Sequence, residues 1–167
     1  MWFDMVTIEF LKTHALFGGI QDSELEKIRA IMEEAHFSEG EIIIKEGEIG
    51  DRLYFIFKGS VEVLKKAGTH EEEAWEPIAK LGEGDTFGEM ELIDVQPRAA
   101  TVKALEQTSA LVLTNKDLYL IEKHSLKTFT IIIMNLAREI SRRLRKMDAM
   151  VAWSLFMQQE NSAHPHQ

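Results

Sequence analysis

The chain has no cysteine, three prolines among 167 residues, and no apolar run long enough to cross a membrane. The missing cysteines exclude disulfides, thiol catalysis and cysteine-based metal sites. The first residues, Met1–Phe17, include Asp4 and Glu9 and lack a basic stretch before an apolar segment, so they do not resemble a signal peptide. We therefore expect a cytoplasmic protein without a membrane span.

Positive charge is also scarce. Nineteen Lys and Arg against 28 Asp and Glu give a formal net charge of −9, which argues against general nucleic-acid binding. Apolar residues make up 45% and charged residues 28%, which is ordinary for one globular domain of this length. Much of the positive charge gathers in one late segment, at Arg138, Arg142, Arg143, Arg145 and Lys146.

Glycine is absent from the back of the chain, since all ten glycines lie at or before Gly88. This distribution separates a turn-rich front from a helical back. Two short helices are predicted before the strands, over residues 4–14 and 24–34. Ser23-x-x-Glu26 would form a capping box for the second helix.

From Ala35 the pattern changes to short apolar runs between turns spaced about eight to twelve residues apart. Arg52–Lys58 is apolar at nearly every position, so both faces of this strand should be covered. The pattern predicts an α+β, mainly β, fold with an antiparallel β-roll or jelly roll over residues 35–114. The predicted strands are 35–38, 41–45, 52–58, 60–66, 74–81, 99–104 and 108–114.

Helices are predicted after the roll, over residues 115–156. Thr114-x-x-Asp117 can cap a helix over Asn115–His124, and a long helix should follow over Leu126–Phe156. It could lie on its own roll, but its heptad seam extends past the roll's expected reach, which favours a homodimer through this helix. Residues 1–157 would form a single domain and 158–167 a disordered tail. The seam residues are Ile133, Ala137, Ile140, Leu144, Met147 and Val151.

The segment Phe87–Lys103 contains the most chemically specific residues. Gly88 lets backbone approach a ligand, and the short apolar turn after it would direct free N–H groups and a helix dipole at an anion. Arg98 supplies a guanidinium that matches two phosphate oxygens. Glu89 would repel a phosphate, so its presence indicates a neighbouring hydroxyl such as a ribose 2′-OH. A phosphate beside a free 2′-hydroxyl is the chemistry of a 3′,5′-cyclic nucleotide.

Each of these residues has a simpler explanation when taken alone. Thr86-x-x-Glu89 fits a helix capping box, Arg98 fits an ordinary surface arginine, and Gly88 and Pro97 fit turns. Their occurrence together in one segment favours the phosphate-binding interpretation.

The run FGEMELI, followed four residues later by RAATV, resembles the phosphate-binding cassette of cyclic nucleotide-binding domains. Such domains occur in catabolite-activator-type regulators, cyclic-nucleotide-dependent kinases and gated channels. The resemblance covers roughly Leu11–Val151 and implies an eight-stranded β-roll whose late helix closes over the base. The ligand-binding residues that it implies are Gly88, Glu89, Met90, Glu91, Arg98, Ala99, Ala100, Val63, Ile78 and Met147.

The resemblance also bears on the base. Family members that select guanine often carry threonine after the cassette arginine, whereas this chain has Ala99, so we expect cAMP rather than cGMP. Glu91 stands where the family usually has alanine, which brings a second carboxylate near the anion. Met147 and Asp148 stand where relatives present hydroxyl residues; Met147 could pack on a purine, and Asp148 could accept from an adenine amino group.

The expected action is a population shift, in which phosphate binding draws Arg98 inward and the helices over 115–156 repack toward an unknown downstream protein. Arg142 or Arg143 would add positive potential near the phosphate. The residues after 157 are too few for the helix-turn-helix of activator-type relatives, so DNA binding by that route is not expected. Enzymatic activity is not expected either, because no set of catalytic residues stands out.

Two alternatives remain open. A degenerate β-roll would keep the fold for dimerisation and would have lost its ligand through Glu91 and Asp148. A cupin-type metal-dependent enzyme would need closely spaced strand histidines with a carboxylate, but the six histidines are scattered. The pair His164 and His166 lies in the expected tail. No Ser-His-Asp or paired-carboxylate set stands out.

Overall fold

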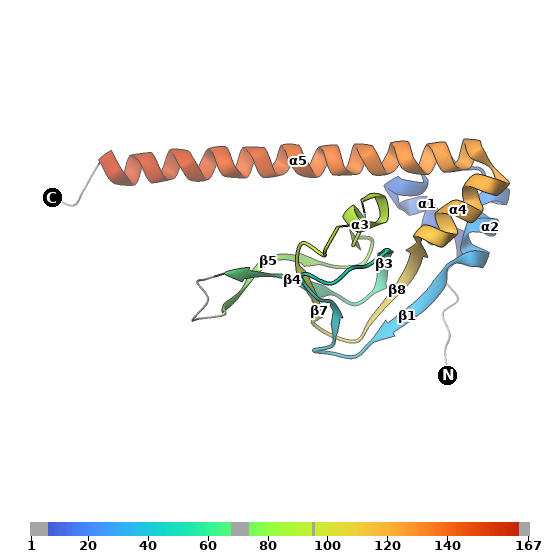
Figure 1. Cartoon of the computed structure of the whole chain (residues 1–167), viewed down its shortest axis with the longest axis horizontal. Coiled ribbons are helices and arrows are strands. Elements are labelled where there is room, and N and C mark those ends of the chain that lie inside the picture. Colours follow the sequence, from blue (N-terminus) through green and yellow to red (C-terminus); the bar gives the residue numbers. More distant parts are fainter. Residues whose placement is uncertain (1–6, 68–73, 95, 164–167) are drawn as a thin grey trace.

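The computed structural model describes residues 7–67, 74–94 and 96–163. Two four-stranded antiparallel sheets form a β-roll, with short helices gathered at one end and one long helix lying along the roll and projecting beyond it (Figure 1). This arrangement confirms the predicted α+β fold with an antiparallel roll.

The strand order is β1-β8-β3-β6 in one sheet and β2-β7-β4-β5 in the other. Strands β3, β5 and β8 have the predicted bounds, and β1 begins two residues before the predicted start because Glu33 and Glu34 also pair with β8. Strand β6 was missed, since two residues are too few to give a periodic pattern. The strands are β1 Glu33–Phe37, β2 Ile42–Ile44, β3 Arg52–Lys58, β4 Val61–Ala67, β5 Ala74–Leu81, β6 Thr86–Phe87, β7 Thr101–Ala104 and β8 Thr108–Thr114.

Strand β3 separates two hydrophobic clusters. Leu53 and Phe55 pack in the cluster that includes the helices, whereas Tyr54 and Ile56 pack in the cluster inside the roll. All four side chains are buried. Because successive side chains of a strand point to opposite faces, this alternation confirms that both faces of β3 are covered.

The helices lie close to the predicted positions. Helix α2 covers 22–31 rather than 24–34, because Glu33 and Glu34 belong to β1, and residues 4–6 of the first predicted helix lie outside the described residues. The capping box at Ser23 is wrong, because α2 has Gln21 as its N-cap and no side-chain cap bond. The box at Thr114 is confirmed: its hydroxyl accepts from Asp117 N at 3.2 Å, and Asp117 Oδ2 accepts from Thr114 N at 2.8 Å. The helices are α1 Ile8–Thr13, the 3₁₀ helix η1 Ala15–Phe17, α2 Asp22–Ile31, α3 Met90–Ile93, α4 Asn115–His124 and α5 Leu126–Ala163.

Helix α5 is longer than predicted, because it continues through residues 158–163 where a disordered tail was expected. Residues 158–163 contain no proline and no glycine, and the next proline is Pro165. Ile132 and Leu136 bury the first part of α5 against the helical cluster. From Ser141 to Met157 every side chain of α5 is exposed. No helix in the described ranges combines the length and apolarity needed to cross a membrane.

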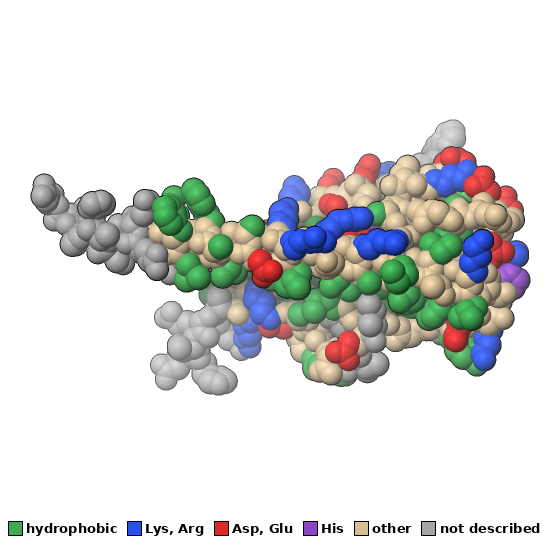
Figure 2. Space-filling view, turned by 90° about the horizontal axis from the view of Figure 1, so that it is seen from above, with side chains coloured by type: hydrophobic (Ala, Val, Ile, Leu, Met, Phe, Trp, Pro, Cys, Tyr) green, Lys and Arg blue, Asp and Glu red, His purple; other side chains and the backbone are tan. Residues whose placement is uncertain are grey.

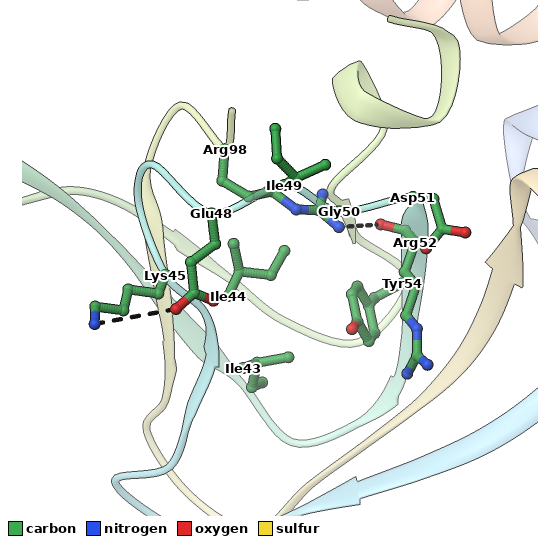
Figure 3. Close-up of a pocket in the computed structure, with 10 residues that line it drawn as sticks. All are labelled: Ile43, Ile44, Lys45, Glu48, Ile49, Gly50, Asp51, Arg52, Tyr54 and Arg98. Atoms are coloured by element: carbon green, nitrogen blue, oxygen red, sulfur yellow. Dashed lines mark hydrogen bonds and ion pairs between the residues drawn. The ribbon is translucent and has the colours of Figure 1, made fainter. Parts of the chain in front are cut away.

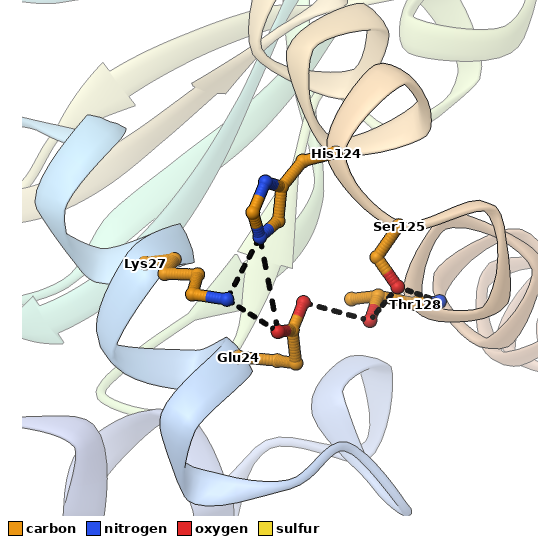
Figure 4. A network of polar contacts seen from close by, with 5 residues as sticks. All are labelled: Glu24, Lys27, His124, Ser125 and Thr128. Carbon is orange, nitrogen blue, oxygen red and sulfur yellow. Dashed lines mark hydrogen bonds and ion pairs between the residues drawn. The ribbon is translucent and has the colours of Figure 1, made fainter.

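A polar network holds α2 against the corner between α4 and α5 (Figure 4). Thr128 Oγ1 donates to Glu24 Oε2 at 3.2 Å, and Lys27 Nζ lies 2.8 Å from Glu24 Oε1. Lys27 Nζ also lies 2.8 Å from His124 Nε2. The hydrogen bond from Lys27 holds the pKa of Glu24 below its usual value. The start of α5 is therefore fixed to the N-terminal helices.

Candidate functional site

The predicted cassette lies between β6 and β7 and contains the short helix α3. Gly88 follows β6 with φ = +83°, a conformation that side chains other than glycine rarely adopt. A Cβ at this position would lie 2.5 Å from Arg52 O and 2.8 Å from Arg98 Nη1. Glycine is therefore required for both the backbone turn and the close approach of the arginine.

The Arg98 side chain is buried, with 6% of its surface exposed. Its Nη2 donates to Arg52 O at 3.1 Å (Figure 3). Its Nη1 donates to Gly88 O at 3.4 Å. The backbone is fixed as well: Arg98 N donates to Glu48 O at 2.8 Å, and Gly47 N donates to Arg98 O at 2.9 Å. The connection between β2 and β3 thus holds Arg98 within the fold.

Gly50 forms part of the cradle for this guanidinium. A Cβ on Gly50 would lie 2.5 Å from both Nε and Nη2 of Arg98. The sequence had indicated only a turn here, because nothing in one sequence shows which side chain packs on a glycine. A hollow of about 230 Å³ adjoins Arg98, smaller than the roughly 300–1,000 Å³ of typical ligand pockets. It is lined by Ile43, Ile44, Lys45, Glu48, Ile49, Gly50, Asp51, Arg52, Tyr54 and Arg98.

Glu89 is buried beside Gly88, with 5% of its surface exposed. Its Oε1 forms an ion pair with Arg143 Nη1 of α5. Its Oε2 is buried and has no hydrogen-bond partner within the described part of the chain. The capping-box explanation at Thr86 is wrong, because α3 has Glu89 itself as its N-cap and no side-chain cap bond. Between the two arginines considered from the sequence, the structure places Arg143 at the cassette.

Burial lowers the pKa of two basic groups near the Arg143–Glu89 contact. Desolvation lowers the pKa of the Arg143 guanidinium, while the charge of Asp85 opposes the shift. Desolvation also lowers the pKa of the nearby buried His14, and Glu139 and then Asp85 oppose that shift. Since an arginine stays charged in a protein, the Arg143–Glu89 contact is a charge-assisted link between α5 and the cassette.

The structure brings Gly88, Glu89 and Arg98 together. The other predicted ligand residues that it describes are partly or largely exposed to solvent. Val63 is half-buried against the cluster inside the roll. The exposed fractions of the more open side chains are 57% for Met90, 60% for Ile78 and 62% for Met147. Ala99 is exposed and Ala100 is half-buried, and the side chain of Glu91 lies outside the described part.

Lys65 and Glu46 hold the start of the strand after Arg98, a role that the sequence did not reveal. Lys65 Nζ donates to Ala99 O and lies 2.7 Å from Glu46 Oε1. The hydrogen bond from Lys65 is the main reason that the pKa of Glu46 is lowered. Thr101 Oγ1 accepts from Glu46 N at 3.0 Å. Within the described ranges, no three His, Asp or Glu side chains gather as a set that could hold a metal ion.

Comparison with known proteins assigns the cassette and roll to one family. The family model described as "Cyclic nucleotide-binding domain" matches residues 34–124. The chain belongs to this family. The match includes β2 to β8 and the whole cassette, so the resemblance inferred from the cassette motif is confirmed.

Several cyclic nucleotide-binding proteins are similar to this chain. The cyclic AMP receptor protein of Thermus thermophilus is 30% identical over 138 residues, which are 83% of this chain and 61% of that protein. A cGMP-dependent protein kinase of Drosophila melanogaster is 35% identical over 63% of this chain and 11% of its own length. The crystal structure of a cyclic nucleotide-binding domain from Methylobacillus flagellatus matches with a TM-score of 0.77 and 26% identity, covering 88% of this chain and 81% of that one. The chain thus spans less than two thirds of the two curated relatives.

Proposed function

We propose that the chain binds a 3′,5′-cyclic nucleotide at the cassette, with cAMP preferred over cGMP, and passes its occupancy on through α5. The observation that carries this proposal is the environment of Glu89. A carboxylate oxygen that is buried without a partner costs free energy unless a donor reaches it. A ribose 2′-hydroxyl would supply that donor, and the buried Arg98 lies next to the same backbone turn.

Each cassette residue would contact a different part of the nucleotide. Arg98 would exchange its hydrogen bonds to two carbonyl groups for charge-assisted bonds to the phosphate. Glu89 would accept from the sugar hydroxyl, and Gly88 would keep the backbone close to the ligand. Ala99 supports the preference for cAMP, because it lacks the hydroxyl that guanine-selecting family members often have at this position.

Arg143 would couple the cassette to the long helix. It is held by Oε1 of Glu89, the same carboxylate whose other oxygen is free for the ligand. A shift of this carboxylate on binding would therefore move α5 relative to the roll and change the surface seen by a downstream protein.

We further propose that α5 pairs with α5 of a second copy. The seam residues Leu144, Met147 and Val151 have exposed fractions of 58%, 62% and 57% in the single chain. They follow a heptad pattern on the part of α5 whose side chains are all exposed, from Ser141 to Met157. A two-fold helix pair would bury this stripe in both subunits.

Calorimetric titration of the Arg98→Ala variant with cAMP and cGMP tests the proposed site. Loss of a buried charge-assisted contact should weaken cAMP binding by about 2–5 kcal/mol, or roughly 30- to several-thousand-fold. Arg142→Ala is the control: it removes an exposed arginine of α5 and should leave the affinity for cAMP unchanged. Equal affinity of the Arg98→Ala variant and the unmodified chain would contradict the proposed site. Absence of cAMP and cGMP binding by the unmodified chain would instead favour a β-roll that only dimerises.

A further inference from the structure

Helix α5 carries a second surface on the side opposite the seam. With 3.6 residues per turn, the six side chains that form this second surface fall within an arc of about 100° centred roughly opposite the seam. The proximal part is basic and the distal part is aromatic. We define the outer face as Arg138, Arg142, Arg145, Lys146, Trp153 and Phe156.

The outer face is open in the structure. Trp153 and Phe156 have exposed fractions of 63% and 50%, and their ring centroids lie 6.1 Å apart. All four basic side chains are exposed, and no carboxylate in the described part of the chain pairs with them. Figure 2 shows Lys and Arg side chains along the middle of α5, with hydrophobic side chains gathered farther along the helix.

The acidic side chains of α5 avoid this face. By helical geometry, Glu139 lies just outside one border of this face, and Asp148 lies nearer the seam than the outer face. Arg138 donates to Asn135 Oδ1 and Arg145 donates to Ser141 Oγ, but neither partner carries a charge. In a chain with a net charge of −9, a basic stripe without carboxylate partners in the described part is an exception that requires a reason. Arg, Trp and Phe make up most of this face, and these residue types are enriched at protein interfaces.

The two-fold pairing of α5 determines whether a lipid surface or a protein segment can bind the outer face. Because the outer face lies opposite the seam, the outer faces of a helix pair point away from each other. A flat lipid surface could reach only one of them at a time, whereas a protein segment can bind each one separately. This step rests on the proposed pairing of α5.

We infer that each outer face docks an acidic amphipathic helix of a partner protein, with carboxylates against the basic part and apolar side chains against Trp153 and Phe156. The 11 to 14 residues from Arg142 to these aromatic residues correspond to about 16–21 Å of helix. The partner helix must therefore carry its acidic cluster and its apolar anchors about this distance apart. Such a helix would supply the downstream contact through which α5 acts.

A designed peptide tests this surface. The probe is a fluorescein-labelled, capped helical peptide of about 24 residues, with four glutamates on one face and Leu and Phe about 18 Å further along the same face. Its binding to the full chain is followed by fluorescence anisotropy. Arg142→Glu/Arg145→Glu should weaken binding at least about tenfold, as should Trp153→Ser/Phe156→Ser. Lys80→Glu/Lys116→Glu makes the same charge change at exposed sites on β5 and α4 and should leave binding unchanged.

Four outcomes would overturn the inference: no binding of the probe, equal weakening by the Lys80 and Lys116 changes, equal binding of a peptide with its two clusters at the wrong spacing, or binding of vesicles containing anionic lipid in place of the probe. Sedimentation and cAMP titration of the same variants separate this test from the proposed function. The outer-face variants should keep the subunit number and nucleotide affinity of the unmodified chain, so a loss of either would instead question the seam or the cassette.

Discussion

Replacing Arg143 by methionine should destabilise the fold, because it leaves the buried Glu89 carboxylate without its cation. Breaking a fully buried ion pair costs about 3–5 kcal/mol, and a hydrogen bond to a charged group contributes about 1.5–3 kcal/mol. The Glu89 side chain is 6% exposed, but that of Arg143 is 46% exposed, so water screens part of the attraction. We therefore expect Arg143→Met to lower the free energy of unfolding by about 1.5–3 kcal/mol.

Urea denaturation followed by circular dichroism measures this loss. Arg142→Met is the matched control, because this neighbouring arginine is exposed and should change stability by less than about 0.5 kcal/mol. In the Glu89→Gln variant the buried charge is absent. Adding Arg143→Met to this variant should therefore lower the free energy of unfolding by at least about 1 kcal/mol less than the same change does in the unmodified chain. If Arg143→Met cost no more than Arg142→Met, α5 would not be linked to the cassette as described.

Two further predictions concern His14 and Gly88. Because burial lowers the pKa of His14 below its ordinary 6.5, the unfolded chain binds more protons below that pH, and stability should fall as the pH drops through about 6.5. Urea denaturation between pH 7.5 and about 5 should show this loss of stability. His14→Phe should reduce the loss, whereas the control His36→Phe, at an exposed site, should not. The same dependence of stability on pH in all three proteins would contradict the role of His14. Gly88→Ala should lower stability by about 1–3 kcal/mol and weaken cAMP binding, because it combines positive φ with contacts to Arg52 O and Arg98. Gly82→Ala meets no atom within 4 Å and should cost less, so equal effects of the two alanines on stability and binding would refute the proposed role of Gly88.

The strands and capped helices that have strong local patterns were predictable from the sequence. Arg52–Lys58 is a long apolar run covered on both faces, and Thr114 forms the expected capping box. Patterns set by only one or two residues failed. Ser23 has the residue types of a cap, but α2 begins at Asp22, which makes Ser23 part of the helix. The end of α5 was also misplaced, because residues 158–163 carry no helix-stopping residue.

The central part of the site was predictable because its residues are close in sequence. Gly88, Glu89 and Arg98 lie within one short segment, and the motif fixes their relation. Contacts from distant elements were not predictable: Arg143 reaches Glu89 from α5, and Gly50 forms the cradle of Arg98 from a loop. Several basic residues of α5 were equivalent in the sequence, and only the packing of α5 on the roll selects Arg143.

Native mass spectrometry of the purified chain, with and without cAMP, tests the central claim most directly, because it counts nucleotides and subunits together. The account predicts a dimer that gains two cAMP molecules, and an Arg98→Ala dimer that gains none at the same nucleotide concentration. A chain that stays unliganded at saturating cAMP and cGMP would contradict the account.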